Sequence, residues 1–330
     1  MDAPRLSLIT PSYQQAAYLR ECIRSVIEQG DGVEHIMVDG GSDDGSRAIL
    51  EQHASRFHWW CSEKDRGQSD AINKGLAHAT GAVFGWLNSD DAWLPGTADR
   101  VRSAFAADPE LLVFGGQVTH RDSSGERTFD ALNDNGDTRR LYADPVINQP
   151  ATFYRMSVVK ELGGVDPALR YVMDVELWWQ VLFRHGTQHL RFERVPLAMF
   201  RLHDASKTVS QHSGFLAEMA ALLHGLCHRT GNTDLADVLA LGHAPRSDLR
   251  GIPASREAHH AIVRTMALHF LLKWHGHVHD AAEFSMMRAL HDRGLLQAHD
   301  LMLPAMRQRA SEAAAKVAGT TWTRYRIRRK

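Results

Sequence analysis

Two hydrophobic periods alternate along the first part of the chain. Continuous apolar runs, which are typical of buried strands, are separated by segments in which apolar residues recur at helical spacing. The apolar runs cover residues 6–10, 34–39, 57–61 and 82–87, and the helical segments cover residues 19–27, 46–53 and 68–79. Strands that alternate with helices in this way form a mainly parallel sheet with helices on both faces. The pattern therefore predicts an α/β, Rossmann-like fold.

The pattern becomes less regular after about residue 110 and then changes to helices. We expect a strand at 111–118, a polar loop at 122–137, extended segments at 149–154 and 190–202, and a helix at 174–184. Beyond about residue 210, apolar residues recur at helical spacing in several segments, without an internal repeat of fixed length. The sequence therefore predicts a sheet domain at residues 1–208, followed by an all-helical C-terminal region at residues 209–330.

Composition and charge exclude several classes of protein. Of the 330 residues, 44% are hydrophobic and 23% are charged, which is typical of a globular chain. The net charge of −1 gives no argument for nucleic acid as a partner. Three scattered cysteines, the absence of a signal peptide and the absence of a long apolar segment predict a cytoplasmic protein with reduced thiols.

The C-terminus interleaves aromatic and basic residues from Trp322 to Lys330. Each basic residue near an anionic membrane surface contributes about 1 kcal/mol of attraction, so this segment is suited to a peripheral contact with the inner face of a membrane. A solvated chain end is the alternative interpretation. The sequence alone leaves both open.

Polar clusters follow several of the predicted strands. They occupy residues 10–13, 39–42, 63–67 and 88–91, and the carboxyl ends of strands in such sheets form the ligand-binding edge. Asp90 and Asp91 repel each other unless a positive group lies beside them, and a divalent cation with oxygen ligands, Mg²⁺ or Mn²⁺, would supply it. A helix cap is the alternative role for this pair. Asp39 precedes two glycines that allow close approach of a ligand, so it could accept from a base N–H or a ribose hydroxyl.

A set of motifs follows in order along about residues 5–208. They are Ile9-Thr10-Pro11-Ser12-Tyr13, residues 38–46, residues 63–75, Gly81, residues 86–91, residues 149–153, residues 163–166, residues 173–178 and Arg201-Leu202-His203. This ordered set resembles the family 2 glycosyltransferases with the GT-A fold. The resemblance implies an inverting glycosyltransferase of the hexosyltransferase type, with a nucleotide-binding part at 1–118 and an acceptor part at 119–208. It further implies a nucleotide-sugar donor, commonly a UDP-sugar, and a saccharide or lipid-linked saccharide acceptor in the synthesis of cell-surface polysaccharide or glycan.

The resemblance also implies a role for each matching residue. Thr10, Pro11, Ser12 and Tyr13 would line the nucleotide pocket, Asp39 would bind the base, Asp65, Arg66 and Gly67 would close over it, and Asn73 would support that loop. Asp90 would reach the ribose or the sugar, Asp91 would hold the cation on the diphosphate, and His203 would contact the diphosphate or the cation. Because the motif reads Ser89-Asp90-Asp91 rather than Asp-X-Asp, the division of roles between the two acids stays open.

The general base expected from the resemblance is Asp174, at the start of the predicted 174–184 helix. It would take the proton of the acceptor hydroxyl during a single in-line displacement. Many relatives carry a second acid just before this position, where this chain has Met173. Glu176 is the alternative base, although it faces another side of a helix. A helix cap is the structural alternative for Asp174.

Two other functions remain to be considered. A sugar nucleotidyltransferase shares the fold class but carries a glycine-rich, basic loop after its first strand, where this chain has Thr10 to Gln15. A catalytically inactive, carbohydrate-binding or scaffolding homologue is the second alternative. The presence of all four acids, Asp39, Asp90, Asp91 and Asp174, argues against it.

Overall fold

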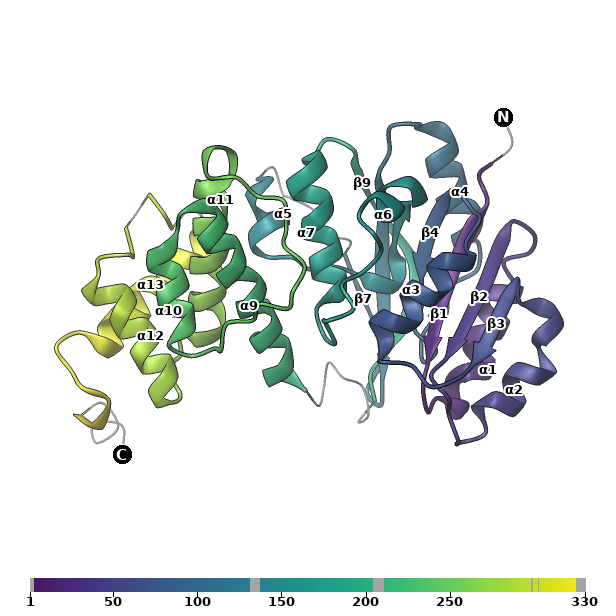
Figure 1. The fold of residues 1–330 in the computed structure, drawn as a ribbon, viewed down its shortest axis with the longest axis horizontal. Coiled ribbons are helices and arrows are strands. Elements are labelled where there is room, and N and C mark those ends of the chain that lie inside the picture. Colours follow the sequence, from purple (N-terminus) through teal and green to yellow (C-terminus); the bar gives the residue numbers. More distant parts are fainter. Residues whose placement is uncertain (1–2, 131–136, 204–210, 298, 302, 325–330) are drawn as a thin grey trace. The chain divides into compact units, whose positions relative to one another are not determined.

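The protein forms two compact units. The computed structural model describes residues 3–130, 137–203, 211–297, 299–301 and 303–324. The sheet unit comprises Met1–Asn133 and Val146–His212, and the helical unit comprises Asp134–Pro145 and Ser213–Lys330. Figure 1 shows the strands of the sheet unit in purple to teal and most helices of the helical unit in green to yellow. A short segment from the middle of the chain, 134–145, thus belongs to the helical unit.

The sheet unit alternates strands and helices in its first half. Its strands are β1 (Leu6–Ser12), β2 (Val33–Asp39), β3 (Trp59–Ser62), β4 (Val83–Trp86), β5 (Ala92–Trp93), β6 (Val113–Asp122), β7 (Gly125–Phe129), β8 (Thr152–Arg155) and β9 (Leu190–Arg201). Its helices are α1 (Ala16–Ile27), α2 (Ser46–Gln52), α3 (Gln68–His78), α4 (Thr97–Ala107), α6 (Met156–Glu161) and α7 (Met173–His185), with short 3-10 turns η1 (Ala54–Arg56) and η2 (Gln149–Ala151). The predicted strands and helices of the first hundred residues are confirmed.

The strands form one sheet in the order β3-β2-β1-β4-β8-β6-β9-β5, with β7 paired to β6. The first four strands along the chain pair in parallel, as expected from the helices between them. The remaining strands are mixed, because β8 runs antiparallel to both β4 and β6 while β9 runs parallel to β6. This α/β architecture agrees with the predicted fold class.

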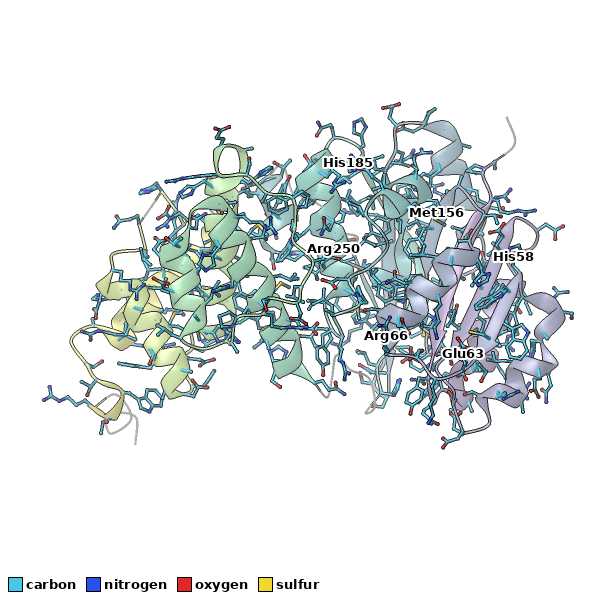
Figure 2. All side chains as sticks on the ribbon, viewed as in Figure 1. His58, Glu63, Arg66, Met156, His185 and Arg250 are labelled. Carbon is cyan, nitrogen blue, oxygen red and sulfur yellow. The ribbon has the colours of Figure 1, made fainter. Side chains whose placement is uncertain are left out.

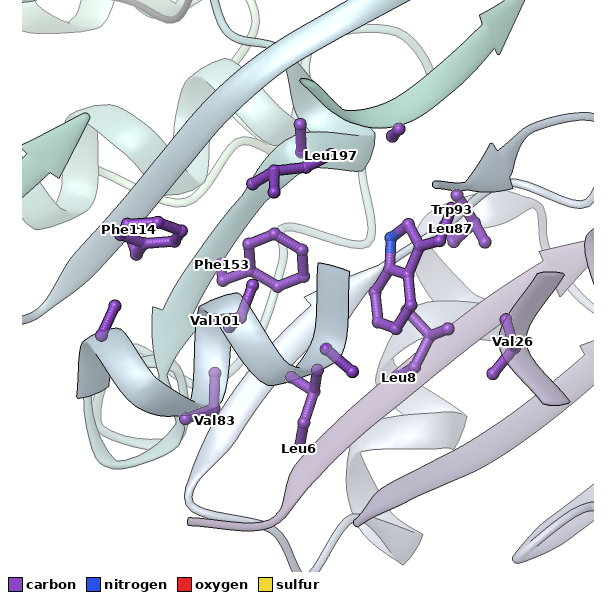
Figure 3. Close-up of a cluster of buried hydrophobic side chains, with 14 of the residues drawn as sticks. Leu6, Leu8, Val26, Val83, Leu87, Trp93, Val101, Phe114, Phe153 and Leu197 are labelled. Atoms are coloured by element: carbon purple, nitrogen blue, oxygen red, sulfur yellow. The ribbon is translucent and has the colours of Figure 1, made fainter. Parts of the chain in front are cut away.

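The central strand β1 is buried on both faces. Leu6 and Leu8 join a cluster with side chains of α1 and α4, which is drawn in Figure 3. Ile9 points to the opposite face, where α3 approaches so closely that a Cβ on Gly75 would lie 2.6 Å from Cγ2 of Ile9. Successive side chains of a strand alternate between faces, so helices on both sides explain the continuous apolar run.

The prediction of a polar loop at 122–137 is wrong for residues 125–129. Residues 125–129 form β7, which pairs with the end of β6 in a hairpin. Both faces of this hairpin carry polar side chains, so no alternation of apolar residues marks it. Cross-strand polar pairs stabilise it instead, including Thr119 with Thr128 at 3.1 Å and Arg121 with Glu126 at 2.7 Å.

The helical unit is formed by α5 from the middle of the chain and by the C-terminal helices. These are α5 (Arg139–Ala143), α9 (His212–Thr230), α10 (Thr233–Ala240), α11 (Arg256–Phe270), the π-helical turn η3 (Leu271–His275), α12 (Ala281–Asp292) and α13 (Pro304–Val317). Among the described residues, no helix has both the length and the apolar character needed to cross a bilayer.

The basic C-terminal segment lies mostly outside the described residues, which end at Arg324. Within the described part, the ring of Trp322 lies 5.6 Å from the ring of Phe284 on α12. This aromatic side chain therefore packs against the helical unit, and the proposed membrane contact stays a prediction.

Candidate active site

The carboxyl ends of β1, β2 and β3 lie side by side. Ser12, Asp39 and Ser62 are partners in register across these three strands. Figure 2 shows Glu63 and Arg66 near this edge, with His58 at the opposite end of β3. The edge therefore brings together the loops that the sequence predicted to bind the nucleotide.

Asp39 is fully buried and organises the turn that follows β2. Its Oδ2 accepts hydrogen bonds from the backbone N–H of Gly41 and Ser42 and from Oγ of Ser62, at 3.2, 3.0 and 2.7 Å. Its Oδ1 accepts from Oγ of Ser42 at 2.6 Å. A nucleobase would have to share Oδ1 with Ser42, so the base contact of Asp39 stays a prediction.

The loop after β1 presents one exposed aromatic side chain at this edge. Tyr13 is 62% exposed, whereas Thr10, Pro11 and Ser12 are buried. Gln14 adopts a φ of +57°, which is uncommon outside glycine, and its backbone N–H donates to Oγ of Ser42 at 2.8 Å. The strained loop is thus fastened to the turn after β2.

Thr10 forms a buried polar pair with β2. Its Oγ1 lies 3.0 Å from Nε2 of His35. Burial lowers the pKa of His35 to about 3, so this imidazole is neutral at physiological pH. Oγ of Ser12 is buried without a hydrogen-bond partner among the described residues.

The segment 65–67 borders the Asp39 turn. Oδ1 of Asp65 accepts from the backbone N–H of Gly67 at 2.8 Å, and a Cβ on Gly40 would lie 2.9 Å from Oδ2 of Asp65. Burial raises the pKa of this carboxyl. The guanidinium of Arg66 is exposed and pairs with Asp70 at 2.8 Å. Asp65 therefore lies beside the glycine turn, while Arg66 lies at the surface.

Asn73 forms a reciprocal pair of hydrogen bonds with the turn after α6. Its Nδ2 donates to the carbonyl of Val165 at 2.8 Å, and its Oδ1 accepts from the backbone N–H of Val165 at 3.0 Å. Asn73 thus holds the 163–165 turn against α3, and its support for the 65–67 loop stays a prediction.

Gly164→Ala is expected to destabilise the fold by about 2 kcal/mol or more. Gly164 has a φ of +78°, and a Cβ there would lie 2.2 Å from Oδ1 of Asn73. Gly96 is a matched control, because it has a φ of +80° but open space around its Cβ position. Gly96→Ala should cost only about 1 to 2 kcal/mol. Equal shifts of the urea midpoint in both variants would contradict a close contact at Gly164.

The asparagine of the Asn88-Ser89-Asp90-Asp91 run links three elements. Oδ1 of Asn88 accepts from Nε1 of Trp86 at 2.8 Å and from Nε2 of Gln68 at 2.7 Å. Its Nδ2 donates to Oε1 of Gln149 at 3.3 Å, and Nε2 of Gln149 donates to the carbonyl of Trp86. These bonds fix the start of the run to α3 and to the turn before β8.

Asp90 and Asp91 have different surroundings. Oδ2 of Asp90 lies 3.0 Å from Nε2 of His203, and both side chains are slightly exposed. Asp91 is 2% exposed, its Oδ1 accepts from the backbone N–H of Arg201 at 2.9 Å, and its Oδ2 is buried without a hydrogen-bond partner among the described residues. Burial and the neighbouring Asp90 carboxylate raise the pKa of Asp91 well above its usual range.

Besides His203, three residues lie around this pair, and two of them carried no signal in the sequence pattern. Nε of Arg201 donates to the carbonyl of Asp90 at 3.1 Å, and its guanidinium forms an ion pair with Glu21 on α1. The guanidinium also lies 4.9 Å from the ring centre of Tyr18, which in turn lies 4.7 Å from the ring of His203. Arg201 belongs to one of the motifs named above. Tyr18 and Glu21 do not, and they contact Arg201 only because the fold brings α1 beside the end of β9.

Three donor atoms at this turn are candidate ligands for a divalent cation. In octahedral coordination with bonds of about 2.1 Å, neighbouring ligand atoms lie about 3 Å apart, as Oδ2 of Asp90 and Nε2 of His203 do. The unpartnered Oδ2 of Asp91 is a third candidate ligand atom. Among the described residues, however, no group of three or more metal-ligating side chains is already arranged around one point. Binding of a cation would therefore require side-chain movement.

Asp174 borders a small, mainly apolar hollow in the sheet unit. Its neighbours around the hollow include Phe84, Trp86, Ile147, Gln149, Tyr154 and Leu177. Burial raises the pKa of Asp174 to about 6, although Oδ1 accepts from the backbone N–H of Val175. Because Gln149 also binds Asn88, the hollow adjoins the turn that leads to Asp90 and Asp91.

Glu176, the alternative base, lies in a different environment. It is fully buried, and Nε2 of Gln180 donates to its Oε1 at 2.7 Å. It does not border the hollow beside Asp174. Of the two candidate bases, only Asp174 lies among the residues that border the hollow.

The sequence of this chain is similar to those of glycosyltransferases. The profile of glycosyl transferase family 2 matches residues 7–163. An uncharacterised glycosyltransferase of Mycobacterium tuberculosis is 31% identical over 179 residues, which are 53% of this chain and 68% of the relative. The chain belongs to glycosyl transferase family 2.

Other relatives are more distant or cover less of the chain. TuaG of Bacillus subtilis, whose name assigns it to teichuronic acid biosynthesis, is 39% identical over 94 residues, or 27% of this chain and 37% of TuaG. S. aureus TarS matches 95% of this chain with a TM-score of 0.60 at 14% identity, and this chain covers 54% of the TarS chain. TarS 1-349, solved in complex with UDP-GlcNAc, matches with a TM-score of 0.57 at 15% identity, with coverages of 95% and 90%. These matches confirm the GT-A fold.

Proposed function

We propose that this protein transfers a sugar from a UDP-sugar to a saccharide or lipid-linked saccharide acceptor, with the aid of Mg²⁺ or Mn²⁺ and with inversion at the anomeric carbon. The observation that carries the proposal is the Asp90–His203 pair at 3.0 Å beside the unpartnered Oδ2 of Asp91. The binding of UDP-GlcNAc by TarS 1-349 supports a UDP-sugar donor, and the name of TuaG supports a role in cell-surface polysaccharide synthesis.

On the donor side, the loops at the carboxyl edge would hold the nucleotide. Tyr13, Asp39 and Asp65 would surround the base and ribose, while Arg66 would close over them. Asp91 and His203 would hold the cation. Because Asp90 contacts His203, Asp90 would also be a ligand of the cation. A divalent cation there would stabilise the negative charge of the departing UDP.

On the acceptor side, Asp174 would act as the general base. Its carboxylate would accept the proton of the acceptor hydroxyl while that oxygen forms the bond to the anomeric carbon and the bond to UDP breaks. The apolar hollow holds its pKa near 6, so the carboxylate is ionised at neutral pH and is still basic enough to accept a proton. The fold would contribute chiefly by aligning the two substrates.

Binding and turnover with a panel of nucleotides test the proposal directly. Titration calorimetry should detect UDP binding in Mn²⁺ that weakens when EDTA removes the cation, because the diphosphate and the two aspartates repel each other without it. At least one UDP-sugar should then release UDP slowly in the absence of an acceptor. Failure of every UDP-sugar to bind or react would favour an inactive scaffolding homologue. Release of pyrophosphate from UTP and a sugar 1-phosphate would favour a nucleotidyltransferase.

A further inference from the structure

One carboxylate of α1 binds two arginines that lie at the ends of neighbouring strands. Oε1 of Glu21 accepts from Nη1 of Arg121 at 3.1 Å, and its Oε2 pairs with Nη2 of Arg201 at 2.5 Å. Arg121 and Arg201 are partners in register across β6 and β9, and the backbone N–H of Leu202 donates to the carbonyl of Arg121 at 2.9 Å. Glu21 therefore ties the ends of both strands to α1, and all of these residues belong to the sheet unit.

Arg201 in turn contacts both acids of the candidate cation site. Its Nε donates to the carbonyl of Asp90 at 3.1 Å, and its backbone N–H donates to Oδ1 of Asp91 at 2.9 Å. A planar guanidinium carries its N–H groups in fixed directions, so a partner that holds one edge of the group also directs the other edge. The bond from Arg201 to Asp90 therefore depends on where Glu21 holds the guanidinium.

Tyr18 provides a second link between α1 and the same site. It lies three residues before Glu21, and residues at this spacing are neighbours on the surface of a helix. The centre of its ring lies 4.9 Å from the guanidinium carbon of Arg201 and 4.7 Å from the ring centre of His203, whose Nε2 lies 3.0 Å from Oδ2 of Asp90. Because His203 lies beyond the end of β9, strand pairing does not direct its side chain, and the ring of Tyr18 supplies a contact that does.

We propose that Glu21 and Tyr18 are positioning residues, which hold Arg201 and His203 where these side chains meet Asp90 and so preorganise the cation site. The part of this proposal that concerns the cation rests on the proposed function. In this role neither Glu21 nor Tyr18 touches the cation or the substrates. Residues that orient the ligands of a metal typically change its affinity 10- to 100-fold. We expect the lower figure here, because Arg201 and His203 keep their contacts with Asp90 when a residue of α1 is replaced.

Hydrogen exchange measures the positioning without a cation or a substrate. In the metal-free full chain, Glu21→Ala is expected to speed exchange of the backbone amides of Arg201 and Leu202 by about tenfold, because the two strand ends lose their common partner. Glu126→Ala is the matched control. Glu126 pairs with Arg121 at 2.7 Å, and within the described part of the chain its carboxylate pairs with no other arginine. Unchanged exchange in Glu21→Ala, or an equal increase in Glu126→Ala, would overturn the proposal.

The second readout is the ratio of UDP affinity with Mn²⁺ to UDP affinity with EDTA. Glu21→Ala should lower this ratio about tenfold, whereas a merely structural change would weaken UDP binding equally under both conditions. Glu21→Asp keeps the negative charge but shortens the side chain by one CH₂, so that it cannot reach both arginines at once, and it should lower the ratio as well. A normal ratio in Glu21→Asp would show that Glu21 acts through its charge, and the positioning role would fail.

Tyr18 allows a comparison with a conservative variant. Tyr18→Leu removes the ring against which Arg201 and His203 pack, and it should lower the ratio of affinities about tenfold. Tyr18→Phe keeps the ring and loses only the hydroxyl, so it should retain the ratio of the unmodified protein. An equal loss in both variants, or a loss in neither, would contradict a role of the ring.

Failure of this proposal can be distinguished from failure of the proposed function and from unfolding. The side chain of Glu21 is 37% exposed, and exposed ion pairs contribute little to stability, so the Glu21 variants should melt close to the temperature of the unmodified protein. If the unmodified protein shows a large ratio and Glu21→Ala does not lower it, the proposed function stands and the positioning role fails. If UDP binding by the unmodified protein does not depend on Mn²⁺, the proposed cation site fails, and exchange at Arg201 and Leu202 still decides whether Glu21 holds the strand ends.

Discussion

Asp174→Asn is expected to slow sugar transfer by about 100- to 10,000-fold while leaving UDP binding unchanged. The amide has the size of the carboxylate and can still accept from the backbone N–H of Val175, but it cannot take a proton from an acceptor hydroxyl. Single-turnover transfer and UDP titration calorimetry measure the two quantities separately. Normal transfer by this variant would refute the assignment of the base.

Glu176→Gln is the matched control for this experiment. Glu176 lies two residues from Asp174 on α7, and Gln180 donates to its Oε1 within the core. Because Glu176 does not border the hollow, its substitution should disturb stability more than transfer. A large loss of transfer in Glu176→Gln, with little loss in Asp174→Asn, would reverse the two roles.

The raised pKa of Asp174 predicts how the rate of transfer and the stability of the fold depend on pH. Transfer should fall as the pH drops through about 6, because the protonated carboxyl is no longer a base. The unfolded carboxyl ionises near pH 4, so the charge disfavours the folded state above pH 6 by up to about 3 kcal/mol. Asp174→Asn should therefore raise the melting temperature at pH 8 and have less effect at pH 5.

Strand patterns predicted where the candidate donor residues lie in the fold, because these residues follow buried, parallel strands. Asp39 ends β2, and the Asp90–Asp91 turn follows β4, so sheet topology alone places them at the same edge, on either side of β1. Parallel strands order their carboxyl ends along one edge whatever the side chains are. The sequence therefore located the candidate binding edge without showing which atoms meet there.

The contacts that complete this edge come from segments far apart in the sequence. Glu21 is one of many charged residues on an amphipathic helix, and its pairing with Arg201 depends on β9 ending beside α1. The pairing of His203 with Asp90 rather than Asp91 depends on side-chain directions at that same strand end. Hydrophobic periodicity reports which face of an element is buried, but it does not report partners across 180 residues.

The sequence pattern also could not predict that α5 belongs to the helical unit. Residues 139–143 are a short helix in a polar region, with only two buried side chains. The ion pair that fastens its end joins positions 144 and 273, and neither residue belongs to a motif. An isolated helix of this length has almost no stability of its own, so its position depends on packing.

Asp90→Asn, Asp91→Asn and His203→Gln are each expected to reduce Mn²⁺-dependent UDP affinity by roughly 100-fold, because each removes one donor from the cation site. The diagnostic quantity is the ratio of UDP affinity with Mn²⁺ to that with EDTA. In the unmodified protein this ratio should be large, and in the three variants it should approach one. Titration calorimetry with UDP under both conditions measures it.

Asp65→Asn is the control for these variants. It shows the effect of losing a carboxylate that lies at the same edge but is not expected to bind the cation. Asp65 packs against Gly40, beside the Asp39 turn, and its bond to the backbone N–H of Gly67 belongs to the loop expected to close over the base. Its substitution should weaken UDP binding equally with Mn²⁺ and with EDTA, so the ratio is preserved. If Asp91→Asn also preserves the ratio, its buried carboxylate holds the end of β9 through the N–H of Arg201, and the cation is left to Asp90 and His203. Preservation of the ratio in all three variants would refute a cation site at this turn.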